Sequence, residues 1–223
     1  MFKYLAGLIC IGLIVSGCAG KSKFVTDRLT GPVETGRGKI VALLAPVADQ
    51  RAVKQEFDKV YDGNPANDIQ FILEKDLLST NLFDKVITVS EASQSVPADV
   101  VIEPTLQVLK WEVPDYDALL QRVFFVSMLT GGIGGVIYGS TDTDVHGYAA
   151  MHFRVMNVAK DTILDKSYEG HHQEQMAKMR CDTPDTKVRM TGESLKKVLQ
   201  QLDSDLRGLL GTAKPAVVSS QNQ

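Results

Sequence analysis

Four histidines are the side chains of this 223-residue chain that are best suited to binding a metal ion. His146 and His152 lie in one predicted strand, where six positions at about 3.3 Å per residue separate them by about 20 Å. They cannot share an ion. His171 and His172 lie near Glu174, but adjacent strand residues point to opposite faces, and no third soft ligand has a recognisable spacing. The pattern therefore predicts no metal site and no cofactor.

The residue patterns of the common catalytic sites are also missing from the sequence. No serine lies in a Gly-x-Ser-x-Gly turn, and Cys181 has no evident paired base. Asp115 and Asp117 flank Tyr116 in a predicted loop, where a solvated turn is the simpler interpretation than an acid–base pair. The glycines between 131 and 139 are not followed by the Lys-Ser/Thr of a phosphate-binding loop. We predict that the chain is not an enzyme.

Cys18 is the residue whose surroundings most clearly indicate chemistry. It follows a positive charge at Lys3, an apolar run from Leu5 to Val15, and the small residues Ser16-Gly17. These are the parts of a secretory signal, and the apolar run is shorter than the ~20 residues that span a bilayer. The order Val-Ser-Gly-Cys resembles the bacterial lipobox, and the alternative is an ordinary secretory signal that contains a cysteine.

The lipobox resemblance implies removal of residues 1–17 and acylation of Cys18. Several acyl chains give an essentially permanent membrane tether. By resemblance to enterobacterial lipoproteins, Ala19 after the cysteine implies the outer membrane, with the domain facing the periplasm. Residues 18–38 are predicted to be the lipidated N-terminus and a linker, because 19–37 is polar and glycine-containing. A linker of this length reaches at most roughly 60–70 Å, which keeps the domain near its own membrane.

Charge and cysteine content exclude two further features. The formal net charge is −3 with no run of Lys or Arg, so we expect no nucleic-acid partner. Cys10 leaves with the signal and Cys18 is lipidated, so Cys181 has no partner for an intramolecular disulfide. Burial of Cys181 is the favoured interpretation, with intermolecular pairing as the alternative.

Hydrophobic periodicity predicts a single α+β domain over 39–211, followed by a disordered tail over 212–223. Apolar runs predict strands over 39–47, 83–89 and 97–108, and a helix over 65–78. Residues 144–158 alternate between apolar and polar positions and form a hairpin with 162–169 through a turn at 157–161. We expect 171–186 to be a loop, and a C-terminal helix capped by Thr191 to run to about Leu210. The predicted fold is a mixed or antiparallel sheet with helices packed on one face, in the order β-α-β-β, an apolar glycine-rich insertion, a long hairpin and a C-terminal helix.

Several of these stretches resemble a family of periplasmic lipoproteins. They are the proline-ended strand Val41-Ala42-Leu43-Leu44-Ala45-Pro46, the helix end and strand over 77–86, the run Ala98-Asp99-Val100-Val101-Ile102-Glu103-Pro104, and the long hairpin from Phe153 to Lys166. Together they resemble the lipoproteins built on the TolB N-terminal-like domain, over roughly 39–210. That family includes the curli secretion lipoprotein, a peptidoglycan synthase activator and auxiliary lipoproteins of transporters. The resemblance implies a fold and an envelope location, and not one activity.

The insertion at 123–139 is uncharged and contains five glycines. It is a buried element followed by a packed loop, a partner or oligomer surface, or a lipid-contacting segment. Under the second and third interpretations the contact residues are Val123, Phe124, Phe125, Val126, Met128, Leu129, Ile133, Val136, Ile137 and Tyr138.

The sequence as a whole predicts a membrane-anchored envelope lipoprotein that binds other envelope proteins. It would act without catalysis, as an accessory or assembly component of transport or secretion. A self-assembling ring or pore that uses 123–139 is the second hypothesis, and an envelope hydrolase is the third.

Overall fold

A mixed sheet is the centre of the fold. The computed structural model describes residues 21–25, 29–30, 38–89, 97–114, 116–129, 140–178 and 180–211. Within these ranges the strand order is β3-β1-β4-β5-β6, with β2 beside β4 past the end of β1. β1 runs parallel to β3 and β4, whereas β4, β5 and β6 are antiparallel neighbours. The strands are β1 (Ile40–Leu44), β2 (Ala48–Asp49), β3 (Phe83–Thr88), β4 (Val100–Glu112), β5 (Asp142–Asn157) and β6 (Thr162–Ala177).

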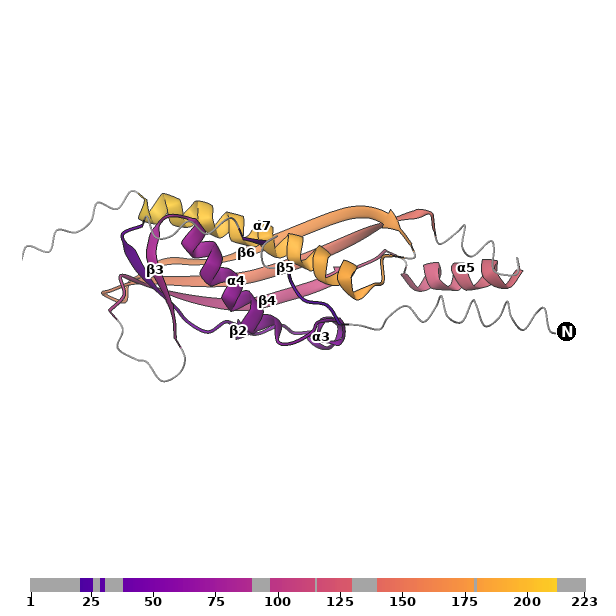
Figure 1. Cartoon of the computed structure of the whole chain (residues 1–223), viewed down its shortest axis with the longest axis horizontal. Coiled ribbons are helices and arrows are strands. Elements are labelled where there is room, and N and C mark those ends of the chain that lie inside the picture. The colour runs from indigo at the N-terminus through magenta and orange to yellow at the C-terminus, as the bar shows by residue number, and fades with distance from the viewer. Residues whose placement is uncertain are drawn as a thin grey trace, which may run out of the picture.

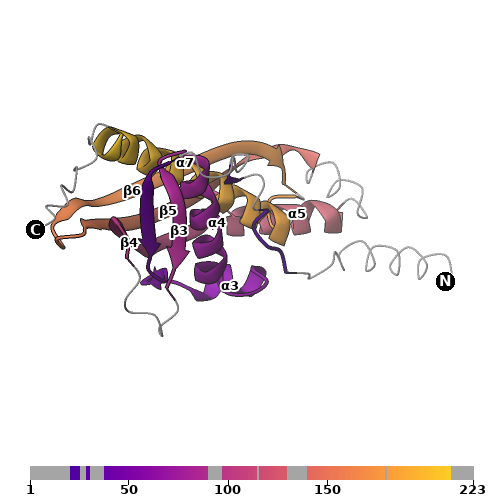
Figure 2. The same cartoon turned by 60° about the vertical axis from the view of Figure 1, so that its left-hand side comes forward.

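Helices α4 and α7 pack against one side of this sheet (Figures 1 and 2). The apolar stripe predicted for 65–78 is buried in α4 and meets buried residues of α7 and the strands in one core. The α+β fold class predicted from the sequence is therefore confirmed. The described helices are α3 (Gln55–Val60), α4 (Pro65–Ser79), α5 (Tyr116–Leu129) and α7 (Pro184–Leu210).

The alternation in β5 has the predicted orientation. Every second residue from Val145 to Val155 is buried, whereas the residues between them are half-buried or exposed, apart from Ala150. Gly147 lies where β5 meets α7, and Gly170 occupies the same place on β6. A Cβ atom at either position would overlap the backbone carbonyl of an α7 residue. The two glycines thus let α7 lie directly against the backbone of the sheet.

Burial in β4 alternates from Val100 to Leu106 and then changes phase. A bulge places Gln107 outside the ladder with β5, because Leu106 pairs with Met151 while Val108 pairs with Ala150. An extra residue reverses the faces of the following positions. Val108 is only half-buried as a result, and Leu109 is buried in its place.

The region after residue 170 differs from the predicted loop. β6 continues to Ala177, and α7 begins at Pro184 with Thr183 as its N-cap. The Thr183 hydroxyl accepts a hydrogen bond from the Thr186 amide at 3.3 Å. Thr191, the predicted cap, lies inside the helix, where its hydroxyl donates to the carbonyls of the preceding turn.

β6 is the edge of the described sheet on its side. Two side chains of α7 reach over this edge and bond to outward-pointing backbone carbonyls. Lys197 Nζ donates to the carbonyl of His171, and Gln201 Nε2 donates to the carbonyl of Glu169 at 2.9 Å.

Cys181, between β6 and α7, is buried and free, as the sequence favoured, and burial raises the pKa of its thiol.

Part of the expected linker belongs to the folded domain. The Ser22 amide donates to the Val60 carbonyl at 2.9 Å, and the Asp62 amide donates to the Ser22 carbonyl at 2.8 Å. Phe24 is buried against the rings of Phe57 and Tyr61, with ring centroids 6.0 and 4.9 Å away. Because aromatic burial stabilises such a contact, residues 22–24 are fixed to the domain rather than free.

Candidate functional site

The described part of the apolar insertion is the C-terminal half of α5. Its side chains at Phe124, Phe125, Met128 and Leu129 are 68%, 65%, 75% and 79% exposed. These positions follow an i, i+1, i+4, i+5 spacing and therefore share one side of the helix. Val126 and Ser127, on the other side, are half-buried. The buried interpretation is wrong for these four residues, which form an outward apolar surface, here called the α5 surface.

The remaining predicted contact residues cannot be placed in this surface. Val123 lies within α5, but its side chain is outside the described part of the structure. Ile133, Val136, Ile137 and Tyr138 lie outside the described residues, and so does Cys18. The lipid attachment and the second half of the insertion therefore stay predictions.

α5 lies beyond the end of the sheet at which β4 ends and β5 begins (Figures 1 and 2). It has 14 residues, so at 1.5 Å per residue it is about 21 Å long. No helix within the described ranges is long and apolar enough to cross a membrane. Exposed apolar side chains that lie together, as these four do, mark a site of contact with another apolar surface.

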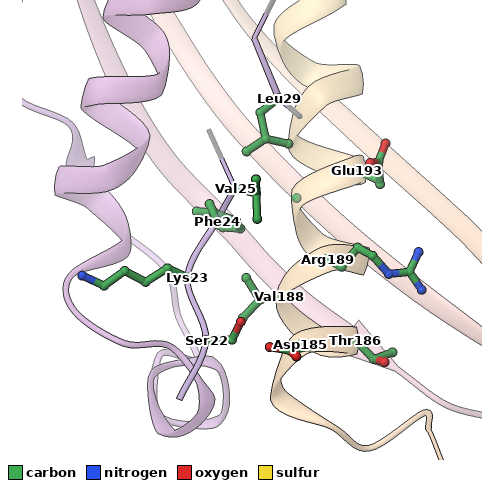
Figure 3. A pocket seen from close by; sticks show the side chains of 11 residues that line it. Ser22, Lys23, Phe24, Val25, Leu29, Asp185, Thr186, Val188, Arg189 and Glu193 are labelled. Carbon is green, nitrogen blue, oxygen red and sulfur yellow. The ribbon is translucent and has the colours of Figure 1, made fainter. Parts of the chain in front are cut away.

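A cavity of about 300 Å³ separates the N-terminal segment from the start of α7 (Figure 3). Phe24, Leu29 and Val188 form its apolar wall, whereas the side chains of Lys23 and Arg189 point away from one another on its two sides. Arg189 is held by two hydrogen bonds to Glu174. Its lining includes Val25 and Leu29, and residues 26–28 between them lie outside the described part, so we assign the cavity no ligand.

The side of β4, β5 and β6 that faces away from α7 carries a stack of polar and aromatic rings, and we call this side the outer face. Strand register aligns Lys110, Tyr148 and His171 in one row. Lys110 Nζ lies 4.6 Å from the Tyr148 ring centroid, and the rings of Tyr148 and His171 are 4.8 Å apart. His146 Nδ1 lies 3.0 Å from His171 Nε2. The result is a platform of stacked rings with an adjacent cation.

The spacing along the sequence separates His146 from His152, and in the structure each of these histidines contacts a residue of β6 instead. His146 meets His171 across two strands, whereas His152 contacts Ser167 and Asp165. Desolvation and the neighbouring His146 lower the pKa of His171. Among the described residues, no group of three or more metal-ligating side chains is present. Only the hairpin register could have revealed the His146–His171 contact.

A second feature missed by the sequence reasoning is a pair of carboxyl groups between α4 and α7. Asp76 is 6% exposed, and one of its oxygens is buried without a hydrogen-bond partner in the described structure. Burial, together with the nearby Asp203, raises the pKa of Asp76 to about 8. Burial also raises the pKa of Asp203, and the positive charge of Arg207 offsets part of that rise. The available signal was the place of Asp76 on the apolar stripe of α4, between Leu73 and Leu77.

Comparisons with known proteins add little to this geometry. No protein-family model matches the chain, and no curated protein matches it. One similar solved structure is a dodecamer of PelC from Paraburkholderia phytofirmans, which is 12% identical with a TM-score of 0.38 and covers 76% of this chain and 94% of that one. Another is a proposed lipoprotein from Caulobacter crescentus CB15, which is 10% identical with a TM-score of 0.34 and covers 74% of this chain and 92% of that one. At these TM-scores neither likeness carries an argument about function.

Proposed function

We propose that the protein is an envelope lipoprotein, anchored through acylated Cys18, that works by binding other envelope proteins rather than by catalysis. Its role would be that of an accessory or assembly component in transport or secretion, at the outer membrane and facing the periplasm. The lipobox-like order at 15–18 supports the anchor, and Ala19 supports the choice of membrane.

The outer face is the observation that carries the binding role. Helices α4 and α7 pack on the opposite side of the sheet, so the row of Lys110, Tyr148 and His171 remains accessible to a partner. Rigid aromatic groups with few rotatable bonds are the side chains that contribute most at protein interfaces. The Lys110 ammonium beside the stack is paired with the Glu112 carboxylate at 2.6 Å, so this position offers a partner both a cation and an anion.

Fatty-acid labelling tests the anchor. Cells grown with a clickable palmitate analogue should incorporate label into the wild-type protein and not into Cys18→Ala. Cys181→Ala is the matched control, because Cys181 is buried and its replacement should leave labelling unchanged. Label that persists in Cys18→Ala would refute the anchor.

Site-specific photo-crosslinking tests the binding role. A benzophenone amino acid at Gln173, an exposed position on the outer face opposite His146, should give a discrete adduct with another envelope protein. The control is the same amino acid at Phe71, which is also exposed but lies on α4. Equal adducts from both positions, or adducts from neither, would contradict a specific partner on the outer face.

The same experiment addresses the ring hypothesis. Adducts whose mass is a multiple of this chain, together with a high-order species in detergent, would indicate self-assembly instead of binding to another protein. The two results are distinguished by the mass and by the peptide composition of the adduct.

A further inference from the structure

We propose that the α5 surface inserts into the surface of the same bilayer that holds the acyl chains of Cys18. The lipid would then be one of two membrane contacts, and α5 would be the second. This inference rests on the lipidation proposed above, and it assigns to Phe124, Phe125, Met128 and Leu129 a lipid environment rather than a protein partner.

The first argument is the distribution of exposure around α5. The four apolar side chains lie on one side of the helix and are at least 65% exposed, whereas Val126 and Ser127 on the other side are half-buried. The helix therefore presents these four apolar side chains to its surroundings. The four side chains are uncharged, and the nearest charge on this side of the helix is that of exposed Arg122, whose long side chain can extend to the polar headgroups.

The second argument is the length of chain between the anchor and the domain. Ser22 is hydrogen-bonded to the residues around the end of α3, and it lies only four positions after Cys18. Four residues reach at most about 14 Å when fully extended. An acylated Cys18 would hold the neighbourhood of Ser22 against the membrane, and not at the distance that a 19-residue linker would allow.

The third argument is the shared end of the fold. Ser22 bonds to Val60, the last residue of α3. Both α3 and α5 lie in the half of the molecule where β4 ends and β5 begins (Figures 1 and 2). The turn between β5 and β6, which contains Val158, lies at the other end of the long hairpin. A membrane drawn close to Ser22 by the short tether therefore faces the end that carries α5.

The length of α5 determines the kind of contact. At about 21 Å it is shorter than the ~30 Å hydrocarbon core, and so it cannot span the bilayer as a single helix. Lying in the interface, such a helix buries its apolar side about 5–10 Å deep. Two attachment points would fix the orientation of the domain, which a single lipidated residue leaves free to rotate.

A paired fluorescent-probe experiment on the full lipidated protein tests this contact. An environment-sensitive fluorophore is attached to Phe125→Cys and, in a separate protein, to Val158→Cys. Val158 is also an exposed apolar residue, 73% exposed, but it lies at the opposite end of the hairpin. Cys181 is fully buried, and the sulfur of an acylated Cys18 is blocked, so the introduced thiol reacts. Both proteins are reconstituted into phosphatidylethanolamine–phosphatidylglycerol vesicles with and without nitroxide-labelled lipid.

We expect nitroxide lipid to reduce the emission of the Phe125 probe roughly twofold or more while iodide has little effect, because the probe lies at the acyl boundary. The Val158 probe should show the reverse. Strong iodide quenching at Phe125 would overturn the proposal, since α5 would then face water. Protection from both quenchers would also overturn it, because another protein surface would cover α5. Palmitate incorporation measured on the same preparation tests lipidation separately, so either failure can be recognised independently.

Discussion

The carboxyl pair between α4 and α7 makes Asp76→Asn a substitution that should stabilise the protein. In the folded state, burial and the proximity of Asp203 raise the pKa of Asp76 from 3.8 to about 8. Between pH 4 and pH 8 the native protein therefore retains a proton that the unfolded chain releases. Because the unfolded state binds fewer protons in this range, the free energy of unfolding falls as pH rises.

The size of the effect follows from the same pKa difference. The interval between the ordinary pKa of 3.8 and pH 7 is about three pH units. Over each of these units the free energy of unfolding falls by about 1.4 kcal/mol. Asp76→Asn, which needs no proton, should raise the free energy of unfolding at pH 7 by up to about 4 kcal/mol. Below pH 4 the two proteins should differ little, since the carboxyl is protonated in both the folded and the unfolded state.

Urea denaturation followed by circular dichroism at pH 4, 5.5, 7 and 8.5 measures this directly. Asp205→Asn is the matched control on α7, because its carboxylate accepts hydrogen bonds from Lys166 and Tyr168, which lower the pKa of Asp205. The control should lose stability at neutral pH, and the loss should vanish as pH falls below about 4. A wild-type stability that is level from pH 4 to 8.5, with no gain in Asp76→Asn, would refute the reasoning.

Four further substitutions test other parts of the fold by the same measurement. Arg51→Gln should cost about 2 kcal/mol, because Arg51 is the main partner of the Asp49 carboxylate and lowers its pKa from 3.8 to about 2. The contribution of Asp49 should disappear as pH falls from about 4 to 2, and unchanged acid stability would contradict this. Gly170→Ala should lower the free energy of unfolding by about 1–3 kcal/mol, because its Cβ meets the backbone of α7. Gly208→Ala is the control, since a Cβ there meets open space, and it should raise the free energy of unfolding by about 0.5–1 kcal/mol. Thr183→Ala should cost about 1 kcal/mol through loss of the N-cap, and an effect near zero would mean that the helix begins elsewhere.

The parts of the fold that were predictable from the sequence are those determined by local periodicity. The alternation from Val145 to Val155 identifies the buried face of β5 because period two and burial on one side coincide. The same rule fails after Leu106, since a bulge is a property of strand pairing and leaves no mark on composition. The start of α7 was missed because its first turn buries Thr186 and Lys187, which do not read as an apolar stripe.

The candidate site depended more on tertiary placement. The exposure of Phe124 and Phe125 depends on where α5 lies relative to the sheet, and an apolar composition fits burial and exposure equally well. The contact between His146 and His171 needs the register of a hairpin whose second strand was predicted to end at residue 169. Asp76 carried the only local signal, a carboxylate on an apolar stripe.

The two bonds from α7 to the β6 edge limit how this protein can assemble. An exposed edge strand is a template on which another chain can add by main-chain pairing. Lys197 and Gln201 already occupy the carbonyls of His171 and Glu169, which an incoming strand would require. Strand addition along β6 is therefore interrupted near its middle, which disfavours polymerisation by edge-to-edge pairing. A partner that pairs with the backbone of β6 would have to do so on one side of the stretch from Glu169 to His171.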